Sequence, residues 1–460
     1  MIGLPPFLSF SENERTLQLK ILMIILRTVK NISSLNIAAS VLLFLAAILA
    51  AVVANSSLSP VYQDFLLQEL HLRIGNFNLF SHGGHPLKMI EFINDCLMTV
   101  FFLAVGLEIK RELLVGELSS VRKAALPFIA ACGGMVVPVV IYALSVASGT
   151  PETRGMAIPM ATDIAFSLGV LSLLGKRVPL SLKIFLTAFA VVDDIGGILV
   201  IALFYSADVA YGYLIAAAVL YVFLYYMGKF GVTQKIFFLF FGVIIWYLFL
   251  QSGIHSTISG VILAFVIPAR PRLDAGKYIE RIRDIIGEFP VSKSDNIVLT
   301  NAQIATLKQV ERASDYVISP LQSLEDNLHG AVSFVILPLF AFANAGVVFS
   351  GSGSIVGDVS IAVAAGLLLG KFLGIYLFTW LAVKSGVALM PAGMNWKNIA
   401  GVSLLGGIGF TVSLFIANLS FADEYPELLN QAKFGVLVGT VLAGVLGYVV
   451  LNWVLLKREK

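Results

Sequence analysis

The chain has 460 residues, of which 58% are hydrophobic and only 13% are charged, and its mean hydropathy is +0.91. This composition excludes an ordinary soluble domain. Recurrent apolar stretches of about 20 residues match the roughly 30 Å hydrocarbon core of a bilayer, so we predict a polytopic membrane protein whose spans are helical. The formal net charge of +3 says little about partners. In a membrane protein the placement of Lys and Arg is more informative than their sum.

The first 36 residues hold four basic groups and a short apolar run at 21–26, without a small-residue cleavage site. We interpret residues 1–36 as a cytoplasmic tail with an interfacial helix, and not as a cleaved signal peptide. Spans one to eight are expected within 37–268, spans nine to twelve within 326–457, and a cytoplasmic end at 458–460. The twelve spans begin near Ile37, Met89, Ala125, Ala157, Leu180, Val209, Lys235, Ile254, Asp326, Ile355, Lys397 and Ala432.

The distribution of basic residues supports an even number of spans. The tails and alternate loops hold 26 of the 31 Lys and Arg residues, and the opposite side holds four, Arg73, Lys88, Arg154 and Lys433. Because basic residues collect in cytoplasmic loops, both termini are expected in the cytoplasm. The one basic residue left over is Lys371, in the middle of span ten.

Two of the expected loops are long and have a sequence pattern of their own. Residues 70–86 alternate apolar positions with the turn pairs Gly75-Asn76 and Gly83-Gly84, a pattern typical of a β-hairpin on the outer face. An irregular outer loop fits this stretch about equally well. Residues 269–325 carry eight basic and eight acidic groups among scattered apolar residues. We expect a cytoplasmic insertion there that is partly helical and has no catalytic motif.

Four ionisable residues lie in the interior of apolar spans: Asp163, Asp193, Asp194 and Lys371. Each such residue costs roughly 2.5–3.5 kcal/mol at a helix centre, so these groups usually face a cavity or a partner and mark an ion path. A purely structural buried salt bridge is the alternative. It explains the set less well, because one Lys cannot neutralise three carboxylates.

Helix geometry separates the roles of these acids. Adjacent residues point about 100° apart, so Asp193 and Asp194 cannot both face one ion. The economical arrangement turns one of them to a cavity and the other to Lys371, with Asp163 as a second cavity carboxylate. Span four reads GMAIPMATDIAFSLGV and span eleven reads GVSLLGGIGFTVSLF, and their Pro and Gly residues favour interrupted helices. Paired interruptions in the middle of two three-span groups, three to five and ten to twelve, point to a transporter site at the membrane midplane.

Seven longer runs extend this pattern: INDCLMTVFFLAVGLEIKREL (93–113), ATDIAFSLGVL (161–171), VVDDIGG (191–197), SGIHSTISGV (252–261), LPLFAFANAGV (337–347), GKFLGI (370–375) and GGIGFTVSLFIA (406–417). In this order they closely resemble the NhaA-type sodium/proton antiporter family, itself a known example of transporters with inverted repeats. The resemblance covers nearly all twelve spans. It implies an all-α integral membrane protein of about 12 transmembrane helices, with two inverted three-helix repeats and interrupted helices four and eleven.

The resemblance also implies roles for the intramembrane residues. Asp163 and Asp194 are expected to bind Na⁺ or Li⁺ in competition with protons, with Thr162 nearby. Asp193 is expected to pair with Lys371, in a salt bridge that could also carry a proton. Burial and like-charge proximity make such carboxylates hold protons more readily, which favours competition near neutral pH.

Residues near the span ends are ambiguous without the resemblance. Glu108 and Glu112 lie one turn apart beside Arg111, which is also the pattern of a solvated helix end. A lone histidine such as His255 is more often a packing residue than a pH sensor. The resemblance places these four residues in a cytoplasmic funnel and in the pH response. Asp95, near the outer end of span two, is expected to cap a helix or to attract cations to an outer funnel.

The implied function is electrogenic export of Na⁺, and of Li⁺, in exchange for H⁺ across the bacterial cytoplasmic (inner) membrane, in the service of pH homeostasis. No enzymatic activity, cofactor or nucleic-acid partner is expected. Membrane lipid surrounds the chain, and the outer hairpin would join a homodimer. The 269–325 loop is longer than the family pattern, so alkaline activation is left open.

Two other classes were compared with this prediction. An intramembrane aspartyl protease also needs two acids, but the chain has no Gly-x-Gly-Asp motif, and a protease gives Asp193 and Lys371 no role. A cation channel usually draws a ring of acids from repeated units, whereas these acids lie on spans four and five. Exchange by a helix bundle that rocks around one shared site accounts for the whole set.

Overall fold

The structure is a computed structural model. It describes residues 37–74, 77–82, 85–205, 209–270, 275–287, 300–349, 354–422 and 424–456. The expected N-terminal tail (1–36) and C-terminal end (458–460) lie outside these ranges, as do both turn pairs of the 70–86 loop and parts of the 269–325 insertion.

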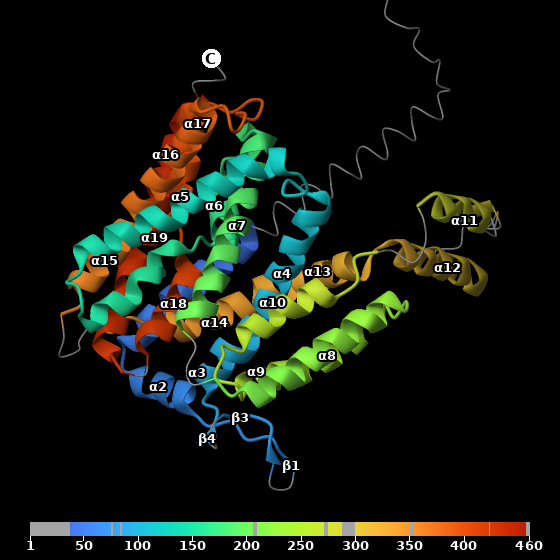
Figure 1. Cartoon of the computed structure of the whole chain (residues 1–460), viewed down its shortest axis with the longest axis horizontal. Helices are drawn as coiled ribbons and strands as arrows, with labels where there is room; N and C mark the ends of the chain where they lie inside the picture. The colour runs from blue at the N-terminus through green and yellow to red at the C-terminus, as the bar shows by residue number, and fades with distance from the viewer. Residues whose placement is uncertain are drawn as a thin grey trace, which may run out of the picture.

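The protein is an all-α membrane protein, as the composition predicts (Figure 1). In the described ranges, eight helices are long and apolar enough to cross a membrane, or up to ten if each of two bent helix pairs is one span. The eight are Ile37–Ala54, Met89–Val115 (α3, η1 and α4), Val121–Ser145 (α5), Leu180–Phe204 (α7), Tyr211–Lys229 (α8), Pro320–Asn344 (α13, η4 and α14), Asp358–Lys384 (α15, η5 and α16) and Pro426–Leu456 (α19).

The two bent pairs are the stretches in which the sequence predicts interruptions. The 3₁₀ helix η2 (Pro151–Met160) meets α6 (Ile164–Leu173) at 46°, and α17 (Trp396–Leu405) meets α18 (Phe410–Phe421) at 44°. Two shorter apolar helices, α9 (Lys235–Leu250) and α10 (Thr257–Val266), complete the apolar set that the structure describes.

Small residues allow the closest helix contacts. A Cβ on Gly374 of α16 would lie 2.1 Å from the carbonyl oxygen of Gly133 on α5, and one on Gly260 of α10 would lie 2.4 Å from the Thr99 carbonyl oxygen of α4. Such approaches are typical of membrane helices, because lipid supplies no hydrophobic drive for helix association and close packing has to replace it. Large apolar side chains on the outside of the bundle face the lipid, for example Leu144 and Phe240.

Among the described spans, three contain a π-helical turn: η1 (Phe92–Leu97), η4 (Val332–Ile336) and η5 (Gly366–Gly370). Such turns often mark functional positions, because they rotate the residues that follow. Here η1 contains Asp95, and η5 directly precedes Lys371.

The two long loops contain short regular elements. After α2 (Ser59–Leu67), strand β1 (Arg73–Ile74) pairs antiparallel with β2 (Phe77–Asn78), and β3 (Ser81–His82) with β4 (His85–Pro86). The outer position of this loop and its part in a dimer stay predictions. In the insertion, α11 (Ala275–Gly287) and α12 (Asn301–Val317) lie side by side, outside the bundle of spans (Figure 1).

Packing at the α5–α16 contact can be tested with Gly374→Ala. The added methyl group meets the Gly133 backbone, which cannot move aside like a flexible side chain, so we expect a loss of about 1–3 kcal/mol in stability. Thermal unfolding in detergent measures the effect. Gly212→Ala in α8 is the control, since a Cβ there meets nothing within 4 Å. Equal melting temperatures for the two variants would contradict the close contact.

Candidate functional site

The site is built where the two bent helix pairs cross. Residues 161–163 and 408–409 leave the helical conformation, so their backbone groups need partners other than lipid. Each break supplies partners for the other. The Asp163 amide donates to the Ile408 carbonyl oxygen at 2.6 Å, and the Thr162 hydroxyl donates to the Gly406 carbonyl oxygen at 2.7 Å. The two breaks therefore stabilise each other.

Two serines and two glycines extend this crossing. The Ser167 hydroxyl donates to the Leu405 carbonyl oxygen at 3.0 Å, and the Ser413 hydroxyl donates to the Ile158 carbonyl oxygen at 2.7 Å. A Cβ at Gly407 would lie 2.3 Å from the Leu367 carbonyl oxygen, and one at Gly409 would lie 2.9 Å from the Ala161 carbonyl oxygen. A larger residue at Gly407 would push this break away from η5, and one at Gly409 would push it away from the break at 161–163.

Asp163 lies between the N-termini of two half-helices. It is the N-cap of α6, and its Oδ1 accepts a hydrogen bond from the Phe166 amide at 3.0 Å. Its Oδ2 accepts from the amide of Thr411, in the first turn of α18, at 3.2 Å and from the Thr411 hydroxyl at 2.8 Å. The side chain is buried. These donors and both helix dipoles stabilise the carboxylate anion that burial destabilises.

Asp193 and Lys371 form a buried ion pair. Lys371 begins α16, and its Nζ lies 2.5 Å from Asp193 Oδ2 on α7, with both side chains 0% exposed. Neither residue lines the cavity described below. In a low-dielectric interior such a pair is tolerated only because the opposite charges compensate each other.

Asp194, the next residue on α7, points to a different place. It lines a cavity of about 320 Å³ that Asp163 and Thr162 also line. Its Oδ1 is buried and has no hydrogen-bond partner in the described part of the protein. An unsatisfied buried carboxylate oxygen is costly, so the site is suited to a ligand that supplies positive charge.

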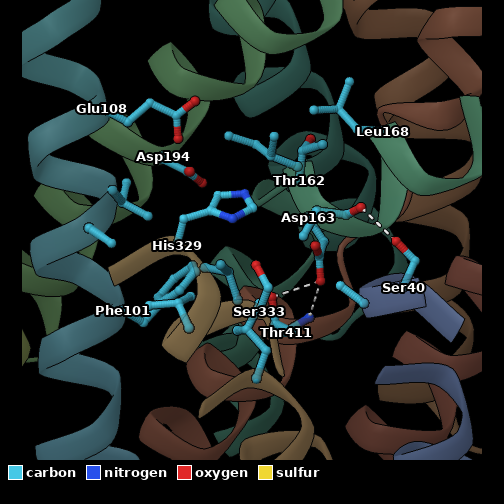
Figure 2. A pocket seen from close by; sticks show the side chains of 18 of the residues that line it. Ser40, Phe101, Glu108, Thr162, Asp163, Leu168, Asp194, His329, Ser333 and Thr411 are labelled. Atoms are coloured by element: carbon cyan, nitrogen blue, oxygen red, sulfur yellow. Dashed lines mark hydrogen bonds between the residues drawn. The ribbon is translucent and has the colours of Figure 1, made fainter. Parts of the chain in front are cut away.

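The cavity brings together polar side chains from six segments (Figure 2). They come from the Ile37–Ala54 helix, from α4, from the 161–163 break, from α7, from the Pro320–Asn344 span and from α18. The polar lining residues are Ser40, Glu108, Arg111, Thr162, Asp163, Asp194, Glu325, His329, Ser333 and Thr411. Figure 2 shows the His329 imidazole projecting between Asp194 and the Thr162–Asp163 segment, with the Glu108 carboxylate beyond Asp194.

Arg111 binds three carboxylates at one end of this cavity. Its Nε lies 2.9 Å from Glu325 Oε1, its Nη1 lies 3.0 Å from Glu112 Oε1, and its Nη2 lies 3.8 Å from Glu108 Oε1. The Arg111 side chain is 33% exposed and that of Glu325 is 20% exposed, so this end is closer to solvent than the two aspartates. Glu112 belongs to the cluster but does not line the cavity.

The structure separates His255 from the other three residues of the expected cytoplasmic funnel. His255 lies just before α10, and the hydroxyl of the adjacent Ser256 contacts Asp95 Oδ1 at 3.4 Å. Asp95 precedes Glu108 by 13 residues along one span, which is about 20 Å at the rise of a helix. His255 therefore lies near Asp95, at the opposite end of α4 from Arg111. The indole of Trp246 also donates to the Asp95 carbonyl oxygen, at 3.4 Å.

Five polar lining residues were not singled out in the sequence: Ser40, Glu325, His329, Ser333 and Thr411. Glu325 fell at the end of the charged 269–325 insertion, and His329 near the start of an expected span. Thr411 carried a signal, because it follows the glycines of one break much as Thr162 and Asp163 follow Pro159 at the other. The contact that brings Thr411 to Asp163 joins residues 248 positions apart, which the local pattern does not encode.

Removing one partner of the buried ion pair tests its compensation. Lys371→Met leaves Asp193 as an unpaired buried charge, so we expect about 3–5 kcal/mol of destabilisation in thermal or denaturant unfolding. Asp193→Asn/Lys371→Met should recover most of that loss, because no charge remains uncompensated. Lys397→Met, at an exposed position of α17, is the control. A double variant as unstable as Lys371→Met would disprove the compensation.

Comparison with known proteins places this architecture in a family. Residues 30–451 match the family described as Na⁺/H⁺ antiporter 1. The chain is 75% identical to the Na(+)/H(+) antiporter NhaA of Bacteroides fragilis (strain ATCC 25285) over 437 residues, covering 95% of this chain and 100% of that protein. The proteins of the same name from Phocaeicola vulgatus and Porphyromonas gingivalis (strain ATCC 33277) are 62% and 47% identical, covering 89% and 93% of this chain and 92% and 96% of theirs. The predicted resemblance is confirmed, and the chain belongs to the Na⁺/H⁺ antiporter 1 family.

Proposed function

We propose that this protein exchanges Na⁺ for H⁺ across a membrane, with both ions competing for Asp163 and Asp194. Relatives that carry the name Na(+)/H(+) antiporter over nearly their whole length support the exchange of these two ions. The observation that supports the site most strongly is the single cavity of about 320 Å³ that two buried carboxylates line, one of them with an oxygen that lacks a partner.

The chemistry of the lining fits a small hard cation. Carboxylate, hydroxyl and carbonyl oxygens are the ligands that such cations prefer, and Thr162 adds a hydroxyl beside the two acids. Li⁺ would be accepted by the same oxygens. Protonation of the carboxylates removes the charge that holds the cation, so occupation by protons and by Na⁺ is mutually exclusive. One site can therefore serve both ions in turn without a hydrolysed cofactor.

The stoichiometry follows from the number of carboxylates. Two protons on Asp163 and Asp194 against one Na⁺ would transfer net charge in each cycle, which makes the exchange electrogenic. The Asp193–Lys371 pair is the alternative carrier of the second proton, because Asp193 is the neighbour of Asp194 on α7. An inward proton gradient would then drive the export of Na⁺ and contribute to pH homeostasis.

Alternating access in this proposal uses twelve spans. The described part of the chain has eight long apolar helices and two bent pairs, which make ten spans if each pair is one span. The shorter helices α9 and α10 would bring the number to twelve. We infer two inverted repeats, one made of α5, η2–α6 and α7, the other of α15–α16, α17–α18 and α19. The mutual hydrogen bonds at the two breaks support this pairing, since they place corresponding segments opposite each other at the site. Rocking of the bundle would expose the site to either side.

Orientation and assembly are part of the same proposal. In this proposal both termini, the Arg111 end of α4 and the 269–325 insertion lie in the cytoplasm, as the bias of Lys and Arg predicts, and the membrane is a bacterial inner membrane. The Arg111, Glu108, Glu112 and Glu325 cluster would then line the cytoplasmic entrance and respond to pH, while Asp95 and His255 belong to the outer side. The strand-containing loop at 70–86 would join two copies in a homodimer.

The two rival classes fit the geometry less well. A protease dyad needs two carboxyl groups that share a proton, yet both oxygens of Asp163 already accept hydrogen bonds from Phe166 and Thr411. A channel needs a continuous polar path, whereas the acids here converge on one cavity at the crossing of two broken helices. Neither rival uses the Asp193–Lys371 pair.

Sodium-induced proton movement tests the site. In inside-out vesicles with an acid interior, added Na⁺ should collapse the pH gradient for the native protein, and Asp163→Asn or Asp194→Asn should abolish the response because each removes a charge that holds the cation. A pH-sensitive fluorophore reports the gradient from pH 6 to 9. Asp358→Asn, at the exposed start of α15, is the matched control. Full activity of Asp194→Asn would overturn the assignment of the site. If neither Na⁺ nor Li⁺ collapses the pH gradient for the native protein, the proposed antiport is wrong.

Thr411 provides a finer test of the competition. Thr411→Val removes the hydroxyl that donates to Asp163 Oδ2 and keeps the shape of the side chain. A donor to a carboxylate favours its ionised form, so its loss favours the bound proton. The apparent KM for Na⁺ should then rise about tenfold, the size of a lost hydrogen bond to a charged group, and rise most at the acid end of the pH range. Thr411→Ser retains the hydroxyl and should behave like the native protein; an unchanged KM in Thr411→Val would exclude this role.

A further inference from the structure

A second cavity, of about 640 Å³, lies at one end of the bundle. It is bounded by the start of α5, by the first half of α7 and by the loop that follows α16, three segments that lie in the same part of the bundle (Figure 1). This end carries the basic loops of the chain, which the proposed orientation places in the cytoplasm. The ion site does not use this cavity, since the two share no lining residue.

One half of this cavity is basic. Arg122 and Lys123 occupy the first turn of α5, both are exposed, and neither forms a salt bridge within the described ranges. Glu117 is the one acid in the lining, so positive charge predominates. The N-cap Ser120 provides no side-chain hydrogen bond to the first turn of α5, and the positive end of a 25-residue helix therefore adds to the attraction for an anion.

The other half is apolar. Phe185 and Ala188 of α7 form its buried wall, and Val387 and Leu389 of the loop after α16 form its rim, with exposures of 63% and 81%. Gly386, at φ +74°, allows the chain to turn directly after α16 and bring this rim over the cavity. An apolar wall of this kind makes no favourable contact with a free inorganic anion, but it can pack against a hydrocarbon chain.

We propose that this cavity binds one anionic phospholipid, with the phosphodiester at Arg122 and Lys123 and an acyl chain against Phe185 and Leu389. Basic pockets between transmembrane helices on the cytoplasmic side bind acidic head groups, because charge and burial of the chain act together. The lipid would contact α7 at Ala188, six residues before Asp194. A bound lipid therefore lies on the helix that carries both the ion site and the ion pair.

Native mass spectrometry of the purified full chain tests this site. Dioleoyl-phosphatidylglycerol and dioleoyl-phosphatidylcholine are titrated in parallel, since they share acyl chains and phosphodiester and differ in net charge. The native protein should bind phosphatidylglycerol more tightly. Arg122→Ala/Lys123→Ala should weaken that binding about 30-fold, because each basic group near the phosphate contributes roughly fivefold. The same variant should weaken phosphatidylcholine binding much less, because the choline cation already neutralises that phosphodiester.

Three comparisons make the result decisive. Lys229→Ala/Lys308→Ala removes the same charge at exposed positions outside the cavity and should bind phosphatidylglycerol like the native protein. Leu389→Asp should weaken both lipids, and millimolar inorganic phosphate should displace neither. The proposal is overturned if the native protein binds the two lipids equally, if the control pair weakens binding as much as the Arg122/Lys123 pair, or if phosphate competes with phosphatidylglycerol.

Discussion

Inside a bilayer, a helix that breaks leaves backbone donors and acceptors that lipid cannot satisfy. In this protein the breaks of η2–α6 and α17–α18 satisfy each other, through the Asp163 amide on Ile408 and the Thr162 hydroxyl on Gly406. The crossing therefore has to be maintained for either helix to stay interrupted, and it brings the N-termini of α6 and α18 to one carboxylate. The cavity, the carboxylates that line it and the close packing of glycines around it all depend on these hydrogen bonds between the two breaks.

Two neighbouring carboxylates of α7 point in different directions, and this gives them different surroundings. Asp193 and Asp194 are neighbours on α7, and the angle between them sends one to Lys371 and the other to the cavity. The carboxylate of Asp193 is paired with a lysine through Oδ2, whereas the carboxylate of Asp194 has no cationic partner in the described part of the protein and lines the cavity. A site that binds and releases a cation needs this division, because a carboxylate held by lysine offers less to an ion than one left unpaired.

The two ends of the bundle differ in a way that suits directed transport. At one end Arg111 gathers three glutamates beside the cavity, and Arg122 and Lys123 stand at a second cavity with an apolar wall. At the other end Asp95 lies with Ser256 and Trp246, close to His255. The Met89–Val115 span joins both ends, and α7, which carries Asp194, also forms the wall of the proposed lipid cavity.

Much of this architecture was predictable from the sequence. Hydropathy is a property of short segments, so the membrane class and the long apolar helices follow from it, whereas the count of twelve spans stays a prediction. Four charged residues within apolar spans marked the region of the site, and Pro159 and the glycines at 406–409 marked the two interruptions. Each of these signals is local, because insertion cost and helix breaking act within a few residues.

Only the tertiary structure decided which side chains share the cavity. It joined Thr411 to Asp163 and brought Glu325 and His329 to the cavity of Asp194, and it moved His255 away to the Asp95 end. These relations depend on helices that are distant in sequence and on the direction in which each side chain leaves its helix. The sequence by itself determined that this is a membrane protein with buried charge at two helix breaks, since composition and local pattern control both. Packing between helices determined which charge is paired and which is left for an ion, because a rotation of α7 by one residue would exchange the two aspartates.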